Sequence, residues 1–97
     1  MNVVIDGRFV LNEADLQRRL AGALGYGPYY RYDVDDLRDH LVAGDPRPVQ
    51  MVWIHAEAVK LALGVPIYDS YVGTLTEIAA ADEGRGWGER FVFRILE

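Results

Sequence analysis

Apolar residues follow two different periods along this chain of 97 residues, and each period predicts one kind of secondary structure. Short, nearly continuous runs of β-branched and aromatic residues are typical of strands buried in a sheet. Apolar residues that recur every three to four positions predict helices with one buried face. Strands are predicted in this way over residues 1–5, 48–54 and 90–97. Helices are predicted over residues 11–25, 34–44, 56–64 and 70–84.

Capping residues support the predicted ends of these helices. Asn12 and Asp33 stand where a side-chain oxygen accepts hydrogen bonds from the free N–H groups of a first helical turn. Ser70 is expected to cap the fourth helix in the same way, which leaves residues 65–69 outside it. Gly25 follows the last apolar position of the first helix, as expected of a residue that ends a helix.

The order of these elements predicts the fold class. Helical segments separate the three apolar runs, and helices that connect strands are typical of parallel sheets with right-handed crossovers. We therefore predict an α/β protein with a three-stranded parallel sheet packed with about four helices. The chain forms one domain, residues 1–97, because a chain of this length buries roughly 60 to 65% of its unfolded surface, enough for one core.

The net charge of −5 narrows the range of partners. An acidic protein is repelled by phosphate backbones and attracted to cationic surfaces, so we expect a basic protein partner and no nucleic acid. No apolar run approaches the roughly 20 residues that span a bilayer, so no membrane role is expected. The chain contains no cysteine and its start lacks an export signal, which favours the cytoplasm. No cofactor or metal is expected.

The second predicted helix carries an acidic face. At 100° per residue, Val34, Leu37 and Leu41 form its apolar stripe, whereas Asp35 and Asp39 fall together on a face turned away from that stripe. Two like charges four residues apart cost a few tenths of a kcal/mol in an isolated helix. Because the helix macrodipole favours acids only in the first turn, it does not account for Asp39.

The loop before this helix is rich in tyrosine. Tyr29, Tyr30 and Tyr32 precede the helix, and tyrosines offer rigid, amphipathic contact area at protein interfaces. Asp33 and Asp36, in contrast, are explained by capping and by the macrodipole. Two interpretations stay open on these grounds: an interaction surface for a cationic partner, or a solvated acidic face beside packed tyrosines.

The segment PYYRYDVDDLRDHL, residues 28–41, resembles the central motif of the barstar family of intracellular ribonuclease inhibitors. The resemblance extends over nearly the whole chain: an opening strand with Asp6-Gly7, the helix DLQRRLAGAL, Trp53 in the second strand, and Glu83-Gly84 before a last strand. It implies a barstar-like fold, a three-stranded parallel sheet with helices around it. It also implies a partner, a small secreted bacterial ribonuclease with a basic active-site cleft.

The resemblance also implies roles for single residues. Asp39 would enter the phosphate site of the ribonuclease, Asp35 would contact its base-recognition region, and Tyr29 would lie against a catalytic side chain. Glu77 corresponds to a supporting acidic residue. The residues expected to contact the partner are Tyr29, Tyr30, Arg31, Asp33, Val34, Asp35, Arg38, Asp39 and Glu77.

Three of these positions depart from the family pattern. Arg31 stands in place of a usual glycine, Asp33 in place of asparagine and Arg38 in place of tryptophan. These changes point to a different cognate ribonuclease.

The alternatives to an inhibitor are an enzyme and a non-inhibitory adaptor. His40 and His55 lack the spacing of a helical zinc motif, and the sequence contains no phosphate-binding loop or dinucleotide fingerprint, so we expect no enzyme. An acidic adaptor or regulatory module that binds another basic protein stays open as the second interpretation.

Overall fold

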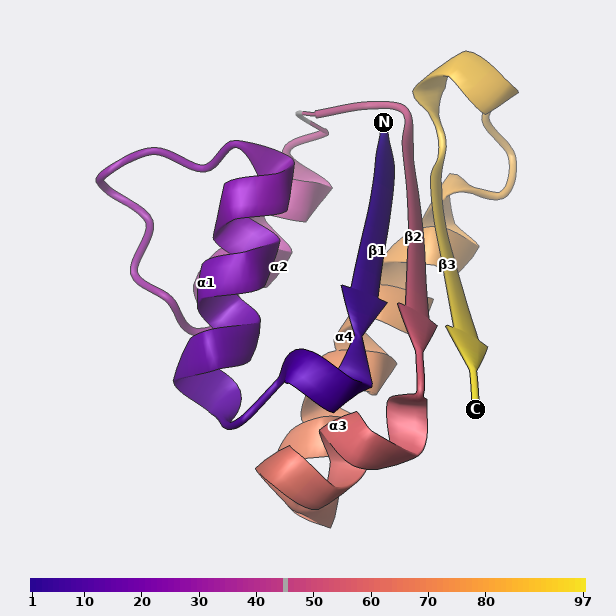
Figure 1. Ribbon diagram of the computed structural model, residues 1–97. Helices are drawn as coiled ribbons and strands as arrows, with labels where there is room; N and C mark the ends of the chain where they lie inside the picture. The colour runs from indigo at the N-terminus through magenta and orange to yellow at the C-terminus, as the bar shows by residue number, and fades with distance from the viewer. Residues whose placement is uncertain (45) are drawn as a thin grey trace.

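The computed structural model describes residues 1–44 and 46–97 and shows helices packed beside a small sheet (Figure 1). In chain order the elements are β1 (Asn2–Asp6), the 3₁₀ turn η1 (Gly7–Phe9), α1 (Glu13–Leu24), α2 (Val34–Val42), β2 (Val49–Ile54), α3 (Ala56–Leu63), α4 (Val65–Asp82), the 3₁₀ turn η2 (Trp87–Glu89) and β3 (Phe91–Leu96). The predicted α/β fold, with a three-stranded parallel sheet and four α-helices in the described part of the chain, is confirmed. None of the described helices combines the length and apolar character that a bilayer span requires.

The sheet has the order β1-β2-β3, and both strand pairs are parallel. In register, Val3 lies beside Met51, and Met51 lies beside Phe93. The chain passes from β1 to β2 through α1 and α2, and from β2 to β3 through α3 and α4. Alternate strand residues are buried under the helices, whereas Val4, on the other face, is 61% exposed. The helices therefore cover one face of the sheet.

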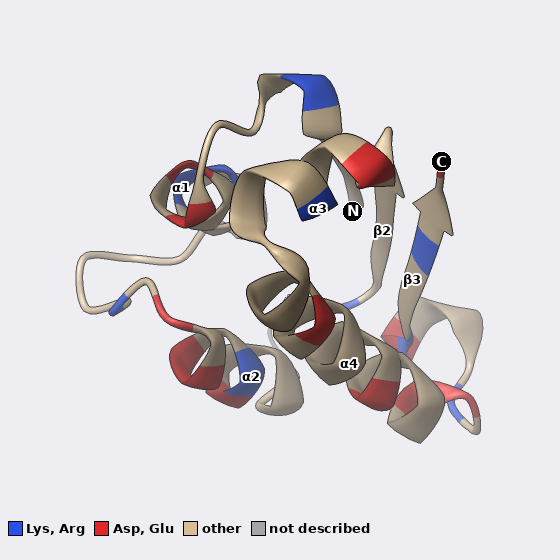
Figure 2. Cartoon of the chain, turned by 90° about the horizontal axis from the view of Figure 1, so that it is seen from below, with Lys and Arg blue, Asp and Glu red and all other residues tan. Residues whose placement is uncertain are grey.

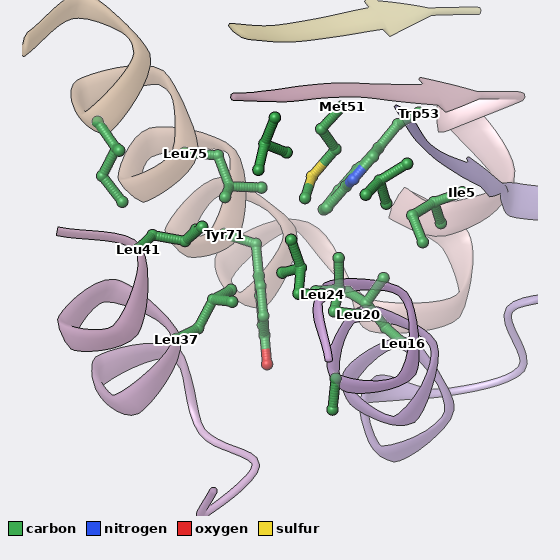
Figure 3. Close-up of a cluster of buried hydrophobic side chains, with 14 of the residues drawn as sticks. Ile5, Leu16, Leu20, Leu24, Leu37, Leu41, Met51, Trp53, Tyr71 and Leu75 are labelled. Atoms are coloured by element: carbon green, nitrogen blue, oxygen red, sulfur yellow. The ribbon is translucent and has the colours of Figure 1, made fainter. Parts of the chain in front are cut away.

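The core lies between that face of the sheet and the helices (Figure 3). Met51 and Trp53 of β2 are fully buried. The apolar stripes of the helices are buried as well, and they comprise Leu16, Leu20 and Leu24 of α1, Leu37 and Leu41 of α2, and Tyr71, Leu75 and Ile78 of α4. Val34 of the predicted α2 stripe is half-buried. Each such side chain contributes roughly 1.5 to 3 kcal/mol relative to an exposed position.

Three of the predicted helix boundaries are confirmed by hydrogen bonds. Asn12 Oδ1 accepts from the Asp15 N–H at 2.8 Å, and Asp33 Oδ1 accepts from the Asp36 N–H at 2.6 Å. Gly25, with φ 75°, ends α1 in the left-handed conformation that glycine adopts most easily. Helix α1 therefore ends and α2 begins where the sequence places them, whereas α2 ends at Val42, before its predicted end at Gly44.

The predicted start of the fourth helix is wrong. Helix α4 begins at Val65, so residues 65–69 are helical and Ser70 is an exposed residue inside the helix. Gly64, with φ 83°, turns the chain sharply between α3 and α4. Pro66 lies in the first turn of α4, where its missing N–H has no intrahelical acceptor to lose. The proline therefore starts this helix instead of delaying it.

A buried ion pair joins the end of α4 to the connection before β2. Asp45 of that connection lies outside the described residues. Arg47 Nε donates to Asp82 Oδ2 at 2.9 Å, and both side chains are less than a tenth exposed. Arg47 Nη2 also donates to the carbonyl of Leu41 at 2.6 Å, and Asp82 Oδ2 accepts from the Phe91 N–H at 2.8 Å. One charge cluster thus holds the C-terminal end of α2 against α4 and the start of β3.

Candidate protein-binding site

The exposed face of α2 carries two acidic side chains that have no partner among residues 1–44 and 46–97. Asp35 and Asp39 are both exposed, as expected from their helical spacing. Leu37 and Leu41 on the opposite face are fully buried, and Val34 is half-buried. Within the described part of the chain, neither carboxylate takes part in a hydrogen bond or an ion pair. Figure 2 shows this acidic helix beside α4. Both carboxylates are free to accept hydrogen bonds from another molecule.

Asp36 has a structural role at the start of α2. It is only 6% exposed, and its carboxylate accepts from the backbone N–H of Arg31 at 2.7 Å and from Arg31 Nη2 at 3.4 Å. Its own N–H donates to Asp33, so the two aspartates cap the helix and fold the preceding loop back onto it. This geometry agrees with the interpretation of Asp33 and Asp36 as helix-start residues.

The same contacts make this helix start sensitive to acid. The N–H of Arg31, with the charges of His40 and Arg31, holds the pKa of the Asp36 carboxyl below its usual 3.8. The ionised carboxylate therefore stabilises the fold fully above pH 3.8, and this contribution is lost as the pH falls through the lower pKa of the folded protein.

We expect Asp36→Asn to lower the free energy of unfolding most near neutral pH, because only the ionised wild-type carboxylate makes these charge-assisted contacts. Urea unfolding of wild type and variant between pH 7 and pH 2 measures the difference between their free energies of unfolding. This difference should become smaller below about pH 4. A difference that stays constant over this range would contradict the assignment.

The three tyrosines of the loop divide into exposed and buried ones. Tyr29 is 91% exposed and Tyr32 is 52% exposed, so both rings are available to a partner. Tyr30 is 4% exposed, and its hydroxyl donates to Gln17 Oε1. The ring of Tyr30 therefore packs in the core and is not part of the exposed contact area that the sequence predicts. Tyr32 also lines a hollow of about 530 Å³ between the loop and α1, together with Asp33.

An ion pair brings α4 to the edge of this surface. Arg38 Nη1 donates to Glu77 Oε2 at 3.4 Å, with side chains that are 55% and 69% exposed. Glu77, which lies 38 positions after Asp39 in the chain, thus stands next to α2. Arg31, in the position of the expected glycine, is 71% exposed in its side chain and is not among the described residues with positive φ. Its backbone conformation therefore does not require glycine.

The sum of these contacts is a negatively charged surface. The charges of Arg31 and Arg38 are compensated by Asp36 and Glu77. Asp33, Asp35 and Asp39 have no cationic partner within residues 1–44 and 46–97. Such a surface accepts hydrogen bonds from arginine, lysine or protonated histidine of a partner.

The histidines take no part in this acidic face. His40 is half-buried, with Nδ1 2.9 Å from the carbonyl oxygen of Asp36 and its ring against Tyr26. His55 is exposed and precedes α3. Among the described residues, no three His, Asp or Glu side chains are grouped as metal ligands.

Two buried residues behind the loop, Gln17 and Tyr71, were not predicted from the sequence to support the site. Gln17 is fully buried on the apolar side of α1, and Tyr71 reaches it from α4. A signal existed for Gln17, since a polar residue next to Leu16 on a core-facing stripe needs a hydrogen-bonding partner. Its two partners, Tyr30 and Tyr71, are 13 and 54 positions away, and the sequence does not identify them.

Comparison with protein families matches residues 1–95 to the family model described as Barstar (barnase inhibitor). The match includes the tyrosine-rich loop, α2 and Glu77. A search of curated proteins finds none that matches the chain.

Proposed function

The chain belongs to the barstar family, and from that premise we propose that it inhibits a small secreted bacterial ribonuclease that prefers guanyl sites. One observation carries the proposal: Asp35 and Asp39 project from the exposed face of α2 with no intramolecular partner in the described chain. Unpaired carboxylates held on a rigid helix are suited to a cationic cleft, because no contact inside the free protein has to break first.

The proposed mechanism is mimicry of the RNA phosphate. A ribonuclease gathers arginine, lysine and histidine around the phosphate that it cleaves, and a carboxylate forms charge-assisted hydrogen bonds with the same groups. We assign this role to Asp39, and to Asp35 the contact with the region that recognises the base. Tyr29 covers a catalytic side chain with its exposed ring.

The remaining residues of the surface set the choice of partner. Arg31 and Arg38 are paired with Asp36 and Glu77 but stay exposed beside the aspartates, so a ribonuclease with a cationic group opposite either of them is disfavoured. Val34 and Asp33 lie at the helix start next to Tyr32, and Tyr30 contributes through the position of the loop. Glu77 supports the acidic face through Arg38.

The inhibitor has no catalytic role of its own. It acts in the cytoplasm of the producing cell, where it blocks the ribonuclease before export. Its net charge of −5 attracts a basic enzyme and slows non-productive contact with RNA.

The test is a titration of RNA cleavage by a panel of small secreted guanyl-preferring ribonucleases. The wild-type protein is expected to abolish the activity of at least one enzyme at a 1:1 molar ratio, because the acidic helix occupies the site that RNA must enter. The variant with both Asp35→Ala and Asp39→Ala serves as the matched control and is expected not to inhibit. No inhibition by the wild-type protein across the panel would contradict the proposal and favour the acidic adaptor. Unbiased capture of basic partners would then be the next experiment.

A further inference from the structure

A chain of hydrogen bonds runs through the core behind the tyrosine-rich loop. The hydroxyl of Tyr30 donates to Gln17 Oε1, and Gln17 Nε2 donates to the Tyr71 hydroxyl oxygen at 2.5 Å. The Tyr71 hydroxyl in turn donates to Glu13 Oε2 at 2.8 Å. These four side chains come from the loop, from α1 and from α4, so the chain ties together three segments that are distant in sequence.

Three of the four side chains are buried. Tyr30 is 4% exposed, and Gln17 and Tyr71 are fully buried. Figure 3 shows Tyr71 reaching from α4 between Leu37 of α2 and the leucines of α1. Burial raises the pKa of both tyrosines, so each hydroxyl keeps the proton that it donates. The Tyr71 hydroxyl gives its one proton to Glu13, so it accepts from Gln17 Nε2, and Gln17 Oε1 is left to accept from Tyr30. The loss of one hydroxyl therefore leaves a buried neighbour unpaired.

The loop itself has few backbone hydrogen bonds to hold it in place. Between the end of α1 and the start of α2, the Tyr26 N–H donates to the carbonyl of Ala21 at 3.0 Å, and the Tyr30 N–H donates to the carbonyl of Gly27 at 3.2 Å. The backbone bonds between the loop and its flanking helices lie at the two ends of the loop, where the N–H groups of Gly25 and Tyr26 donate to Ala21 and the Leu37 N–H donates to the carbonyl of Asp33. The position of the loop therefore depends on side chains, mainly the Tyr30 hydroxyl on one side and the carboxylate of Asp36 on the other.

We propose that the hydrogen-bond chain from Tyr30 through Gln17 and Tyr71 to Glu13 positions the tyrosine-rich loop for binding, so that Tyr29 is held in its bound place before the partner arrives. Gln17 and Tyr71 are positioning residues, because they act on the partner only through Tyr30. A loop ordered in advance costs less conformational entropy on association. The expected effect on binding rests on the proposed function, whereas the expected effect on the loop of the free protein does not.

Amide hydrogen exchange of the free protein tests the anchoring without any partner. Tyr71→Phe keeps the ring in the core and removes only the hydroxyl between Gln17 and Glu13. We expect the backbone amides of Tyr30 and Arg31 to exchange about tenfold faster in this variant, while the amide of Leu41 in α2 keeps its protection. Equal protection of the loop amides in wild type and variant would overturn the proposal.

Tyr68→Phe is the matched control. Tyr68 lies on the same helix and is half-buried, and no hydrogen bond of its hydroxyl is found in the described chain. Its loss should leave loop exchange unchanged. If Tyr71→Phe does not fold, Tyr30→Phe removes the first donor of the chain alone, and the same loop amides are expected to exchange faster; unchanged exchange there would overturn the proposal.

A double-mutant cycle with an inhibited ribonuclease then tests the effect on binding. If Tyr71 acts through the loop, Tyr71→Phe weakens binding in the wild-type background and has little further effect once Tyr29→Ala has removed the loop contact. Its effect should add to that of Asp39→Ala, which lies on α2. If the effect of Tyr71→Phe on binding adds to that of Tyr29→Ala as well as to that of Asp39→Ala, the loss is a general one of stability. That result would overturn the positioning role. If the loop amides exchange faster in Tyr71→Phe but the protein inhibits no ribonuclease, the anchoring of the loop is supported and the proposed function is refuted.

Discussion

Replacement of Asp39 by alanine is expected to weaken binding to the cognate ribonuclease by more than about 2 kcal/mol, the scale of an interface hot spot, for which the barnase–barstar pair is itself a reference case. Asp39 is exposed on α2 and unpaired within the described chain, so the change removes no intramolecular bond from the free protein. In the complex it leaves the cationic groups of the cleft buried without an acceptor. Inhibition constants from RNA cleavage measure the effect, which corresponds to roughly a thirtyfold rise in Kd.

Asp69→Ala is the matched control for this prediction. Asp69 is an exposed acid near the start of α4, and its replacement changes the net charge by the same amount. It is expected to leave the inhibition constant almost unchanged. Equal losses in the two variants would show that net charge, and not a carboxylate in the phosphate site, governs binding. Asp36→Ala does not suit this comparison, because its carboxylate holds the N–H of Arg31.

The second large effect is expected in stability. Asp82→Ala should lower the free energy of unfolding by about 3 to 5 kcal/mol, because it leaves the guanidinium of Arg47 buried without its counter-charge. Both side chains of this pair are less than a tenth exposed, and the change also removes the acceptor of the Phe91 N–H. Urea unfolding at neutral pH measures the loss.

Glu83→Ala provides the comparison for Asp82. Glu83 is the adjacent residue and is exposed, so the loss of its carboxylate should change the free energy of unfolding by about 0.5 kcal/mol or less. Replacement of the whole pair by Arg47→Met with Asp82→Leu should cost less than Asp82→Ala alone, since no charge is then left buried without a partner. If Asp82→Ala cost no more than Glu83→Ala, the pair would not hold α2 and α4 together as the geometry indicates.

Asp39 and the buried pair of Arg47 and Asp82 lie in connected parts of the molecule. Arg47 donates to the carbonyl of Leu41 in the last turn of α2, and Asp39 lies in the same turn on the opposite face. The buried pair thus fixes the end of the helix that presents Asp39. We expect Asp82→Ala to reduce inhibition at temperatures where a fraction of the protein is unfolded, and to leave the inhibition constant of the folded fraction close to wild type.

Much of the candidate site was predictable because it lies on one short helix. The period of α2 by itself directs Leu37 and Leu41 inward and Asp35 and Asp39 outward, and the structure agrees. Burial of the loop side chains was less predictable, because a loop has no periodicity that indicates which side chains are buried. Tyr29 and Tyr30 are neighbours in sequence, yet the first is 91% exposed and the second 4%.

The sequence by itself determined the strands, the first three helices and the acidic face of α2, since these depend on local periodicity and on capping residues such as Asn12 and Asp33. Only the tertiary structure decided that α4 begins at Val65, because a proline two residues after a glycine is compatible with the end of a connection as well as with the first turn of a helix. It also decided which polar groups meet in the core. The pairs Gln17 with Tyr71 and Arg47 with Asp82 are 54 and 35 positions apart, and contacts at such separations depend on how the helices pack against the sheet.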